Sequence, residues 1–448
     1  MAINVTGPGW RTVINGTNGR DVLLGTDDME TIAEHGGADL IYGSGGADQI
    51  IGDDEGAANF LDTVSYEYSG AAVQIDLNAA SQRGGDAEGD VLISIENITG
   101  SRFNDTITGD KGDNVLNGGA GLDVINGGGG SDSLFGGFDH ANDILDGGSG
   151  SDWVDYSAAS RGMTIQLQEL KGFTFVDGFA SLDTALSTFQ FGGKTYTTLT
   201  PAVQEDTLRN IENVVGTQYN NTITGNYQNN IIDGGAGADA INGKGGIDTV
   251  TYASDRSGAD LFIDLLQSVQ HGGHAEGDTL VSIENIIASN GDDSIFGSNG
   301  NNRLEGGAGA DVIFGRDGND TIVSGSGADY LDGGQGMDTF VFNFTGDSGA
   351  TVVTGFQAQL AGVSSYNINL GIDTIRNFET GIDMIDLSGI DADINSAGNQ
   401  QFDFVSKFTG DAGQLVYANG MLMGDVNGDK VADLSIFVNG LNAGDLIL

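Results

Sequence analysis

The chain of 448 residues contains no cysteine, only two prolines and only 16 lysines and arginines. Without cysteine it can form neither disulfides nor thiolate-bound zinc sites. The 64 aspartates and glutamates give a formal net charge of −48, which makes nucleic acid and anionic membranes poor partners. No apolar run approaches the length of a membrane span, and the first ten residues, MAINVTGPGW, lack the basic and hydrophobic regions of a secretory signal. We therefore expect an exported protein with this sequence to use another route.

Glycine is abundant, with 76 residues, but it does not recur at every third position as it does in collagen. Many glycines instead accompany an acidic or amide residue that returns every ninth position within each run, apart from one slip of two residues between Asp132 and Asp143. These 20 positions are Asp21, Glu30, Asp39, Asp48, Asp105, Asn114, Asp123, Asp132, Asp143, Asp152, Asn221, Asn230, Asp239, Asp248, Asp293, Asn302, Asp311, Asp320, Asp329 and Asp338. Two residues after each stands an apolar side chain, from Leu23 to Phe340. We interpret so regular a pattern as a structural repeat.

Six segments follow the stricter pattern GGxGxD, in which glycine permits a tight turn through positive φ and turns carbonyl oxygens inward. With the aspartate, such a turn supplies the all-oxygen ligands that calcium prefers. The predicted calcium ligands in these segments are Gly118, Gly119, Gly121 and Asp123; Gly127, Gly128, Gly130 and Asp132; Gly147, Gly148, Gly150 and Asp152; Gly234, Gly235, Gly237 and Asp239; Gly306, Gly307, Gly309 and Asp311; and Gly333, Gly334, Gly336 and Asp338. The predicted set also includes Asp21, Asp39, Asp48, Asp105, Asn114, Asp143, Asn221, Asn230, Asp248, Asp293, Asn302, Asp320 and Asp329.

Each nonapeptide ends in a short segment such as Asp-Val-Ile at 311–313, whose last side chain would face a core. Two nonapeptides then form one coil of about 18 residues, and acids on neighbouring coils share an ion, giving roughly ten to twelve calcium ions. Ordering nine residues costs about 9–18 kcal/mol, whereas the buried aliphatic side chain returns about 1.5–3 kcal/mol. The prediction is an all-β fold of parallel β-roll (β-helix) solenoid blocks with β-rich connectors, folding as calcium binds.

A longer period divides the chain, because phrases such as DTVSY at 62–66 and DTVTY at 248–252 end successive runs. The predicted parts are an N-terminal cap with the first β-roll block (1–61), a connector (62–104), a second block (105–152), a long connector (153–220), a third block (221–248), a connector (249–292), a fourth block (293–345) and a C-terminal β domain (346–448). The connectors either cap and bridge the blocks or continue the coil without calcium; the isoleucines Ile95, Ile98, Ile283 and Ile286 favour continuation. The segment 170–204 forms either a contact surface, with a short helix around Ser181–Phe189, or a loop.

These motifs resemble the repeats-in-toxin (RTX) family over most of the first 340 residues. The segments 372–391 and 408–448 resemble the C-terminal domain of serralysin-type secreted proteins, including the ending Asp445-Leu446-Ile447-Leu448. This second resemblance implies export by the type I secretion machinery of a Gram-negative bacterium through an uncleaved C-terminal signal. The expected location is therefore extracellular or on the cell surface.

The C-terminal segment also contains the phrase DVNGDKVAD, in which Asp425, Asn427, Asp429 and Asp433 lie at alternating positions as in calcium loops. Lys430 replaces the usual glycine, and the twelfth position is Ile436 instead of glutamate, so the segment is not an EF-hand loop. Both a calcium site and a simple polar turn are compatible with this sequence.

Catalytic motifs are missing: there is neither an HExxH zinc-protease motif nor a GxSxG nucleophile elbow, and we predict no catalytic residue. The repeats resemble modules appended to alginate epimerases, but the catalytic domain of those enzymes does not occur. The sequence favours a structural, self-assembling component of a surface layer, matrix or adhesin, with itself or a cell-surface component as partner. The alternatives are a calcium-dependent effector or bacteriocin-like binding protein that uses 170–204 and, less favoured, a hydrolase with an unrecognised site.

Overall fold

The computed structural model describes residues 12–53, 61–137, 141–167, 206–343 and 372–448, and elsewhere the backbone of the further strands named below. Two compact units, Met1–Asn230 and Ile231–Leu448, divide the chain and are described separately. Regular structure is almost entirely strand, and the helices within the described ranges are single 3-10 turns: η1 (Gly85–Ala87), η2 (Gly273–Ala275) and η4 (Ala443–Asp445). The all-β prediction is confirmed.

The part of the first unit whose backbone is described contains 25 strands in chain order. They are β1 (Ala2–Asn4), β2 (Thr12–Asn15), β3 (Val22–Leu24), β4 (Glu30–His35), β5 (Leu40–Tyr42), β6 (Gln49–Asp53), β7 (Thr63–Ser65), β8 (Gln74–Asp76), β9 (Val91–Ile93), β10 (Asn97–Thr99), β11 (Thr106–Thr108), β12 (Val115–Asn117), β13 (Val124–Gly129), β14 (Ser133–Phe135), β15 (Asp143–Ser149), β16 (Trp153–Asp155), β17 (Met163–Gln166), β18 (Glu169–Lys171), β19 (Thr174–Val176), β20 (Gly178–Leu182), β21 (Leu186–Phe191), β22 (Lys194–Leu199), β23 (Gln204–Arg209), β24 (Asn213–Val215) and β25 (Thr222–Thr224).

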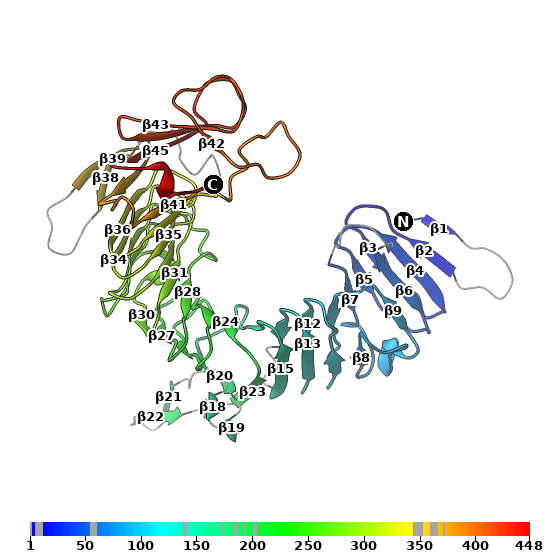
Figure 1. Ribbon diagram of the computed structural model, residues 1–448. Helices are drawn as coiled ribbons and strands as arrows, with labels where there is room; N and C mark the ends of the chain where they lie inside the picture. The colour runs from blue at the N-terminus through cyan, green and yellow to red at the C-terminus, as the bar shows by residue number, and fades with distance from the viewer. Residues whose placement is uncertain are drawn as a thin grey trace. The chain divides into compact units, whose positions relative to one another are not determined.

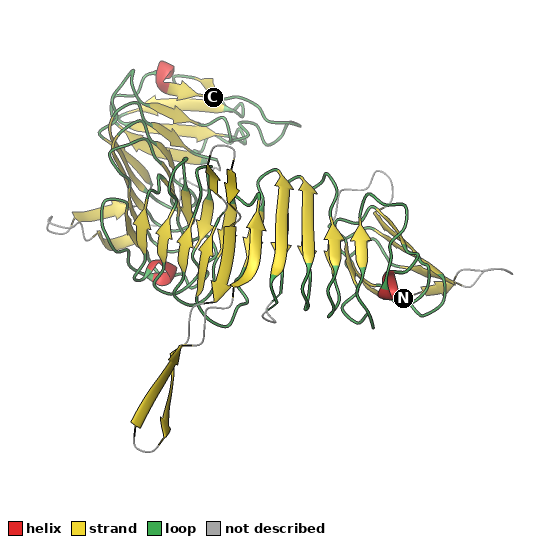
Figure 2. Cartoon of the chain, turned by 90° about the horizontal axis from the view of Figure 1, so that it is seen from below, coloured by secondary structure: helices red, strands yellow, loops and turns green. Residues whose placement is uncertain are grey.

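Within a run of repeats, a strand pairs in parallel with the strand two places later in the chain, as β11 with β13 and β12 with β14 (Figure 1). Thus Ile107 on β11 lies beside Ile125 on β13, and Leu116 on β12 lies beside Leu134 on β14. Both steps span 18 residues, so one coil consists of two nonapeptides, as the sequence predicts. The short arrows aligned side by side in Figure 2 are successive rungs of such ladders.

The core is a column of the apolar residues that follow the repeated acids by two places. Every one of them, from Leu23 to Phe340, is at most 2 % exposed. Strand geometry explains the pattern, because successive side chains point to opposite faces and only the middle residue of each short strand points inward. The inward face predicted from the sequence is confirmed in both units.

The segment 62–104 continues the ladders. Strand β7 pairs with β5 and with β10, which places Ile41, Val64 and Ile98 side by side. Strand β9 extends the ladder of β6, while β8 starts a ladder that β11 continues. Ile95 and Ile98 are buried. Of the two interpretations of this connector, the described strands support the continued coil, whereas the block boundaries themselves stay predictions.

The long connector adds antiparallel strands to the first unit. Strand β20 lies between β17 and β23 and runs antiparallel to both, while β18 with β19 and β21 with β22 form hairpins. The prediction of a short helix around Ser181–Phe189 is wrong, because β20 and β21 cover most of that range. The alternating sequence LSTFQF of β21 has the period of a strand. The side chains that would form the predicted contact surface at 170–204 lie outside the described residues.

The second unit contains β26 (Ile231–Asp233), β27 (Ala240–Asn242), β28 (Thr249–Thr251), β29 (Phe262–Asp264), β30 (Thr279–Val281), β31 (Asn285–Ile287), β32 (Ser294–Phe296), β33 (Arg303–Glu305), β34 (Val312–Asp317), β35 (Thr321–Val323), β36 (Tyr330–Gln335), β37 (Thr339–Val341), β38 (Val353–Ala358), β39 (Tyr366–Leu370), β40 (Asp373–Arg376), β41 (Met384–Asp386), β42 (Asp403–Phe404), β43 (Gln414–Ala418), β44 (Met421–Asp425), β45 (Leu434–Val438) and β46 (Leu446–Ile447). Its ladders repeat the arrangement of the first unit. Strand β30 pairs with β27, and β29 begins the ladder that β32 continues. Ile283 and Ile286 are buried, as the continued coil requires.

The C-terminal strands are joined to the last coils of the repeat. Strands β40 and β41 pair in parallel with β36 and β37, so the solenoid continues beyond the last nonapeptide. Strand β45 follows on β40, and β44 and β43 then add antiparallel neighbours. The final strand β46 pairs with β41 through Leu446 beside Ile385. Among the helices described, none is long and apolar enough to cross a membrane.

Candidate calcium-binding sites

The repeated acids form a ladder along each unit through one carboxylate oxygen. The backbone N–H of Asp293 donates to Oδ1 of Asp311 at 2.8 Å, and that of Asp311 donates to Oδ1 of Asp329 at 2.8 Å. In the first unit, the N–H of Asp105 donates to Oδ1 of Asp123 at 2.7 Å. Acids one coil apart are therefore stacked, as the 18-residue spacing predicts.

The other carboxylate oxygen has no donor at six of the predicted ligands. Oδ2 is buried and has no hydrogen-bond partner at Asp39, Asp132, Asp152, Asp311, Asp320 and Asp338. A buried, uncompensated carboxylate is costly, so each of these oxygens requires a cation or a proton. The surrounding donors are carboxylate and backbone oxygens in a chain without cysteine, and this donor set suits calcium. These six aspartates would hold calcium, which would supply the charge that the fold lacks.

The motif glycines make room for this arrangement. A Cβ on Gly306 would lie 2.3 Å from Oδ2 of Asp311, and a Cβ on Gly127 would lie 2.2 Å from Oδ2 of Asp132. The next glycine, Gly307, has a φ of 97°, a conformation that glycine adopts without strain. The first glycine of the motif thus leaves space beside the carboxylate, and the later ones allow the turn.

Other predicted ligands already have protein donors on their oxygens. Oδ2 of Asp21 accepts from the backbone N–H of Thr17 at 2.6 Å, and Oδ2 of Asp293 accepts from Ser289 N–H at 2.9 Å and Oγ at 3.0 Å. Oδ2 of Asp105 accepts from the backbone N–H of Ser101, and Oδ1 of Asp105 accepts from Oγ of Ser101 at 2.9 Å. Asp21, Asp105 and Asp293 are each the first acid of a run of repeats. At these three positions, a threonine or serine four residues earlier donates hydrogen bonds to the carboxylate.

Four amide rungs are also satisfied within the protein. Nδ2 of Asn302 donates to the carbonyl of Glu284 at 2.5 Å, and Oδ1 of Asn302 accepts from the backbone N–H of Ser298 at 2.7 Å. Asn114, Asn221 and Asn230 likewise donate through Nδ2 to backbone carbonyls and accept through Oδ1. At these four positions a neutral amide takes the place of the carboxylate, and an amide carries no charge that a cation must balance. Calcium ligation by these four residues remains a prediction.

The acid ladder also runs through the connectors, at residues that the ninefold phase does not include. These acids accept the same backbone hydrogen bond on a neighbouring coil: Asp62, Asp90, Glu96, Asp206, Glu212, Asp278, Glu284, Asp373 and Asp383. Each is followed after two residues by a buried apolar side chain, from Val64 to Ile385. The sequence signal was the same acid-to-apolar spacing, hidden because loops of unequal length interrupt the phase.

A tyrosine hydroxyl supports three of these connector acids. The hydroxyl of Tyr66 donates to Oδ2 of Asp90 at 2.8 Å, and that of Tyr252 donates to Oδ2 of Asp278 at 3.0 Å. Tyr156 donates to Asp206 at 2.8 Å in the same way. Each of the three acids also accepts a backbone N–H on its other oxygen. Both carboxylate oxygens of Asp90, Asp206 and Asp278 therefore have protein donors.

Replacing Tyr252 by phenylalanine should destabilise the calcium-loaded protein by about 1–3 kcal/mol, because Oδ2 of Asp278 would lose its donor inside the core. Urea denaturation in saturating calcium measures the difference in the free energy of unfolding, when wild type and variant have the same m-value. Tyr227→Phe is the matched control, since Tyr227 is 58 % exposed. Equal stability of the two variants would show that the hydroxyl of Tyr252 contributes nothing.

Burial without a cation raises the pKa values of the ladder acids. It raises the pKa of Asp320 to about 7, partly offset by the backbone hydrogen bond from Asn302. Burial likewise raises the pKa of Asp132 and of Asp338 to about 6. For Asp311, burial and the neighbouring Asp329 carboxylate raise the pKa well above its ordinary value. Calcium and protons are thus alternative ways to neutralise the same oxygens.

Stability should depend on pH with opposite signs in the absence and presence of calcium. The folded pKa values of Asp132, Asp320 and Asp338 lie above the ordinary 3.8, so their contribution to calcium-free stability is lost as pH rises through about 6–7. The calcium-free protein should therefore retain more β structure at pH 5 than at pH 8. With calcium the order should reverse, because protons compete with the ion. Thermal circular dichroism in metal-free and calcium-containing buffers tests both signs; a calcium-free protein that is more stable at pH 8 would contradict the argument.

The C-terminal loop is closed by its own backbone. Asp425 accepts from the N–H of Gly428 at 2.7 Å on Oδ1 and from the N–H of Lys430 at 2.9 Å on Oδ2. Oδ2 of Asp433 accepts from Val426 at 2.9 Å, and Oδ1 of Asn427 accepts from Asp429 at 2.9 Å. The loop is thus complete as a polar turn, and calcium binding by its four predicted ligands remains a prediction.

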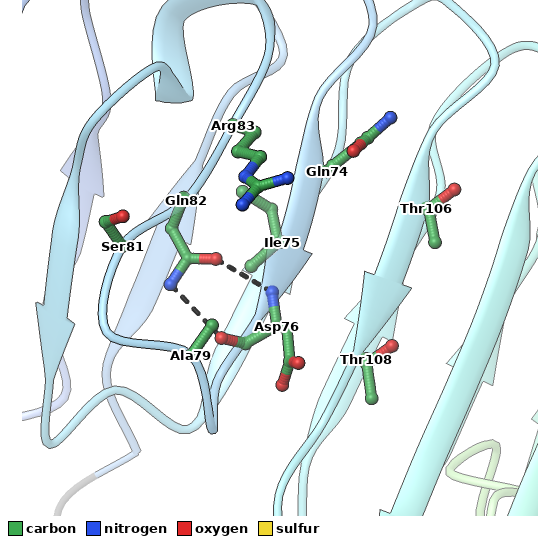
Figure 3. A pocket seen from close by; sticks show the side chains of 9 residues that line it. All are labelled: Gln74, Ile75, Asp76, Ala79, Ser81, Gln82, Arg83, Thr106 and Thr108. Atoms are coloured by element: carbon green, nitrogen blue, oxygen red, sulfur yellow. Dashed lines mark hydrogen bonds between the residues drawn. The ribbon is translucent and has the colours of Figure 1, made fainter.

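A cavity of about 340 Å³ lies beside the loop after β8 (Figure 3). Gln82 closes that loop, since its Oε1 accepts from the N–H of Asp76 at 2.8 Å and its Nε2 donates to the Asp76 carbonyl at 3.1 Å. The lining consists of Gln74, Ile75, Asp76, Ala79, Ser81, Gln82, Arg83, Thr106 and Thr108. Apart from Ile75 and Ala79, the side chains that line this cavity are polar.

The parallel coils and their stacked acids define a calcium-binding β-roll repeat protein. The repeats are of the RTX type: the model of the RTX calcium-binding nonapeptide repeat matches residues 35–55, 94–125, 111–140, 141–158, 215–250, 282–313 and 305–340. A solution structure of the AlgE6R3 subunit from the Azotobacter vinelandii mannuronan C5-epimerase is similar over 34 % of this chain and 77 % of its own length, with 21 % identity and a TM-score of 0.23. A search of curated proteins gave no match.

Proposed function

We propose that the protein leaves a Gram-negative cell unfolded through type I secretion machinery, folds outside as calcium binds, and serves as a self-assembling component of a surface layer, matrix or adhesin. One observation carries the proposal: buried carboxylate oxygens without donors recur along both units. Folding that depends on them requires calcium at about the concentration outside cells, on the order of 0.1–1 mM for extracellular modules. We assign the protein no catalytic role.

The C-terminal segment supports the proposed route. Its resemblance to serralysin-type domains implies a secretion signal at the C-terminus. In the folded protein, Asp445 is 3 % exposed and its Oδ1 accepts from the N–H of Gly381 at 2.9 Å, while Leu446 pairs with Ile385. A signal in this segment would be fully accessible in the unfolded chain, whereas its Asp445 side chain is buried once the chain has folded outside.

Repetition of surface features supports the structural role. The connectors 62–104 and 249–292 have the same construction: the N–H of Asp76 donates to Gln82 at 2.8 Å, and the N–H of Asp264 donates to Gln270 at 2.7 Å. A 3-10 turn follows in both, η1 in one and η2 in the other. A chain that presents the same outward loop more than once offers repeated lateral contacts, which suit assembly into an array.

Negative-stain electron microscopy of the purified chain, at about 1 mM calcium and after chelation, tests this role. Ordered sheets or filaments that form with calcium and disappear on chelation are expected. Discrete particles at all protein concentrations in calcium would contradict self-assembly and turn the search toward a binding partner. Magnesium at the same ionic strength is the control for charge screening.

A further inference from the structure

One repeat of the first block has a carboxylate where the motif places glycine. Asp39 is preceded at five residues by Glu34, whereas Asp123 and Asp311 are preceded there by Gly118 and Gly306. Among the corresponding positions of all the repeats, Glu34 is the one acid. The turn itself is kept, because the next residue, His35, has the positive φ of 78° that a glycine has elsewhere. The repeat therefore has the ordinary backbone with an added acidic side chain.

That side chain enters the space that the glycine motif keeps open. Glu34 lies on β4 with its side chain on the inward face, between the buried Ile32 and the turn, and is 0 % exposed. Oε2 accepts the N–H of Gly36 at 3.0 Å, while Oε1 is buried and has no hydrogen-bond partner. Oδ2 of Asp39, which is 2 % exposed, has no partner either.

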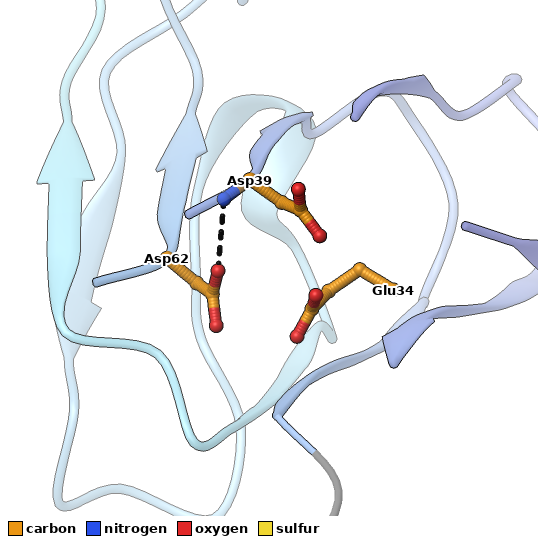
Figure 4. A group of neighbouring side chains, drawn as sticks. All are labelled: Glu34, Asp39 and Asp62. Atoms are coloured by element: carbon orange, nitrogen blue, oxygen red, sulfur yellow. Dashed lines mark hydrogen bonds between the residues drawn. The ribbon is translucent and has the colours of Figure 1, made fainter. Parts of the chain in front are cut away.

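A third carboxylate comes from the next coil. The N–H of Asp39 donates to Oδ1 of Asp62 at 2.9 Å, which fixes that side chain beside Asp39. One oxygen from each of Glu34, Asp39 and Asp62 lies within 4.8 Å of the others, and Figure 4 shows the three carboxylates facing one space. An ion about 2.3–2.6 Å from each oxygen can span such a separation. Three buried like charges at this distance strongly favour a cation between them.

We propose that Glu34, Asp39 and Asp62 hold one calcium ion as a tricarboxylate site, distinct from the glycine-motif sites and tighter than they are. The inference deepens the proposed calcium-dependent folding and rests on it. Calcium affinity rises with the number of charged ligands, and the ordinary repeat supplies glycine where this one supplies a third carboxylate. Because this site is the tightest, its ion is the first to bind as calcium rises. The site joins β4 to the turns before β5 and β7, so that ion orders the first block before the others.

Calcium titration against a competing chelator tests the site in the full-length chain. The variants are Glu34→Gln, which keeps the volume; Glu34→Gly, which restores the motif; and Glu88→Gln, which removes the same charge from an exposed side chain. Wild type and Glu88→Gln should show one ion bound more tightly than the rest. In Glu34→Gln and Glu34→Gly the affinity of that ion should fall by about tenfold or more, toward that of the repeat sites.

Hydrogen exchange during the same titration locates the ion. In wild type, β4 and β5 should become protected at lower calcium than the strands of the second unit, and Glu34→Gln should abolish this order. Unchanged binding curves for Glu34→Gln, together with a more stable calcium-free state, would overturn the inference and show that the three carboxylates share a proton instead. A wild-type chain that binds no calcium would instead refute the proposed function itself.

Discussion

Removal of calcium at neutral pH should abolish most of the β-sheet circular dichroism signal of this protein. The reason is the ladder of buried acids, in which Asp39, Asp132 and Asp320 each place an oxygen without a donor in the interior. At pH 8 Asp132 and Asp320 would be mostly charged and would repel neighbouring acids, because burial raises the pKa of Asp132 only to about 6 and that of Asp320 only to about 7. With a formal charge of −48, the chain has further repulsion that opposes collapse.

The measurement is far-ultraviolet circular dichroism during titration with a chelator, followed by titration with calcium. The signal should return on addition of calcium and not on addition of equal magnesium, since magnesium demands a smaller, octahedral site and gives up its waters reluctantly. Sedimentation in the same solutions should show expansion of the chelated chain. Full β structure in excess chelator at pH 8 would refute calcium-dependent folding.

The substitution Gly306→Ala should cost about 1–3 kcal/mol and at least one bound ion, although it adds a single methyl group. Its Cβ would lie 2.3 Å from Oδ2 of Asp311 and 2.4 Å from the carbonyl of Ser324, so either the turn or the carboxylate must move. Both oxygens border the space in which the ion is expected. The loss of calcium should therefore accompany the loss of stability.

Gly300→Ala is a matched control in the same unit, because its Cβ would meet nothing closer than Oγ of Ser298 at 3.6 Å. Urea denaturation in saturating calcium and the calcium stoichiometry by equilibrium dialysis measure the two effects. Equal stoichiometry in Gly306→Ala and Gly300→Ala would show that the space beside Asp311 holds no ion.

Much of this fold could be predicted because each nonapeptide has its own local signal. The apolar residue two places after each acid identified the core, and the 18-residue period gave the strand partners. The connectors were harder, since Asp62 and Asp90 keep the acid-to-apolar spacing but lie 14 and 42 residues after Asp48. Which coil such an acid joins depends on the path of a loop, and that path is not encoded by any local period.

The candidate sites show a similar division between local and distant signals. Closure of Asp293 by Ser289, four residues earlier, could have been found by inspecting the residues before each run. The bond from Tyr66 to Asp90 joins residues 24 apart on different coils, so it could not have been found from the neighbouring sequence. Glu34 was visible as an exception to the glycine motif, but its meaning required the position of Asp62 on the neighbouring coil.

The tyrosine-supported rungs have a consequence for how the protein responds as calcium falls. In a solenoid each coil interacts only with its neighbours, so the folding of one coil stabilises the coils next to it. The bonds from Tyr66 to Asp90, Tyr156 to Asp206 and Tyr252 to Asp278 join acids that do not belong to the predicted calcium ligands. Coils on the two sides of such a joint stay coupled while their ions leave, so melting should proceed in a few broad steps shared by many coils instead of one step for each ion.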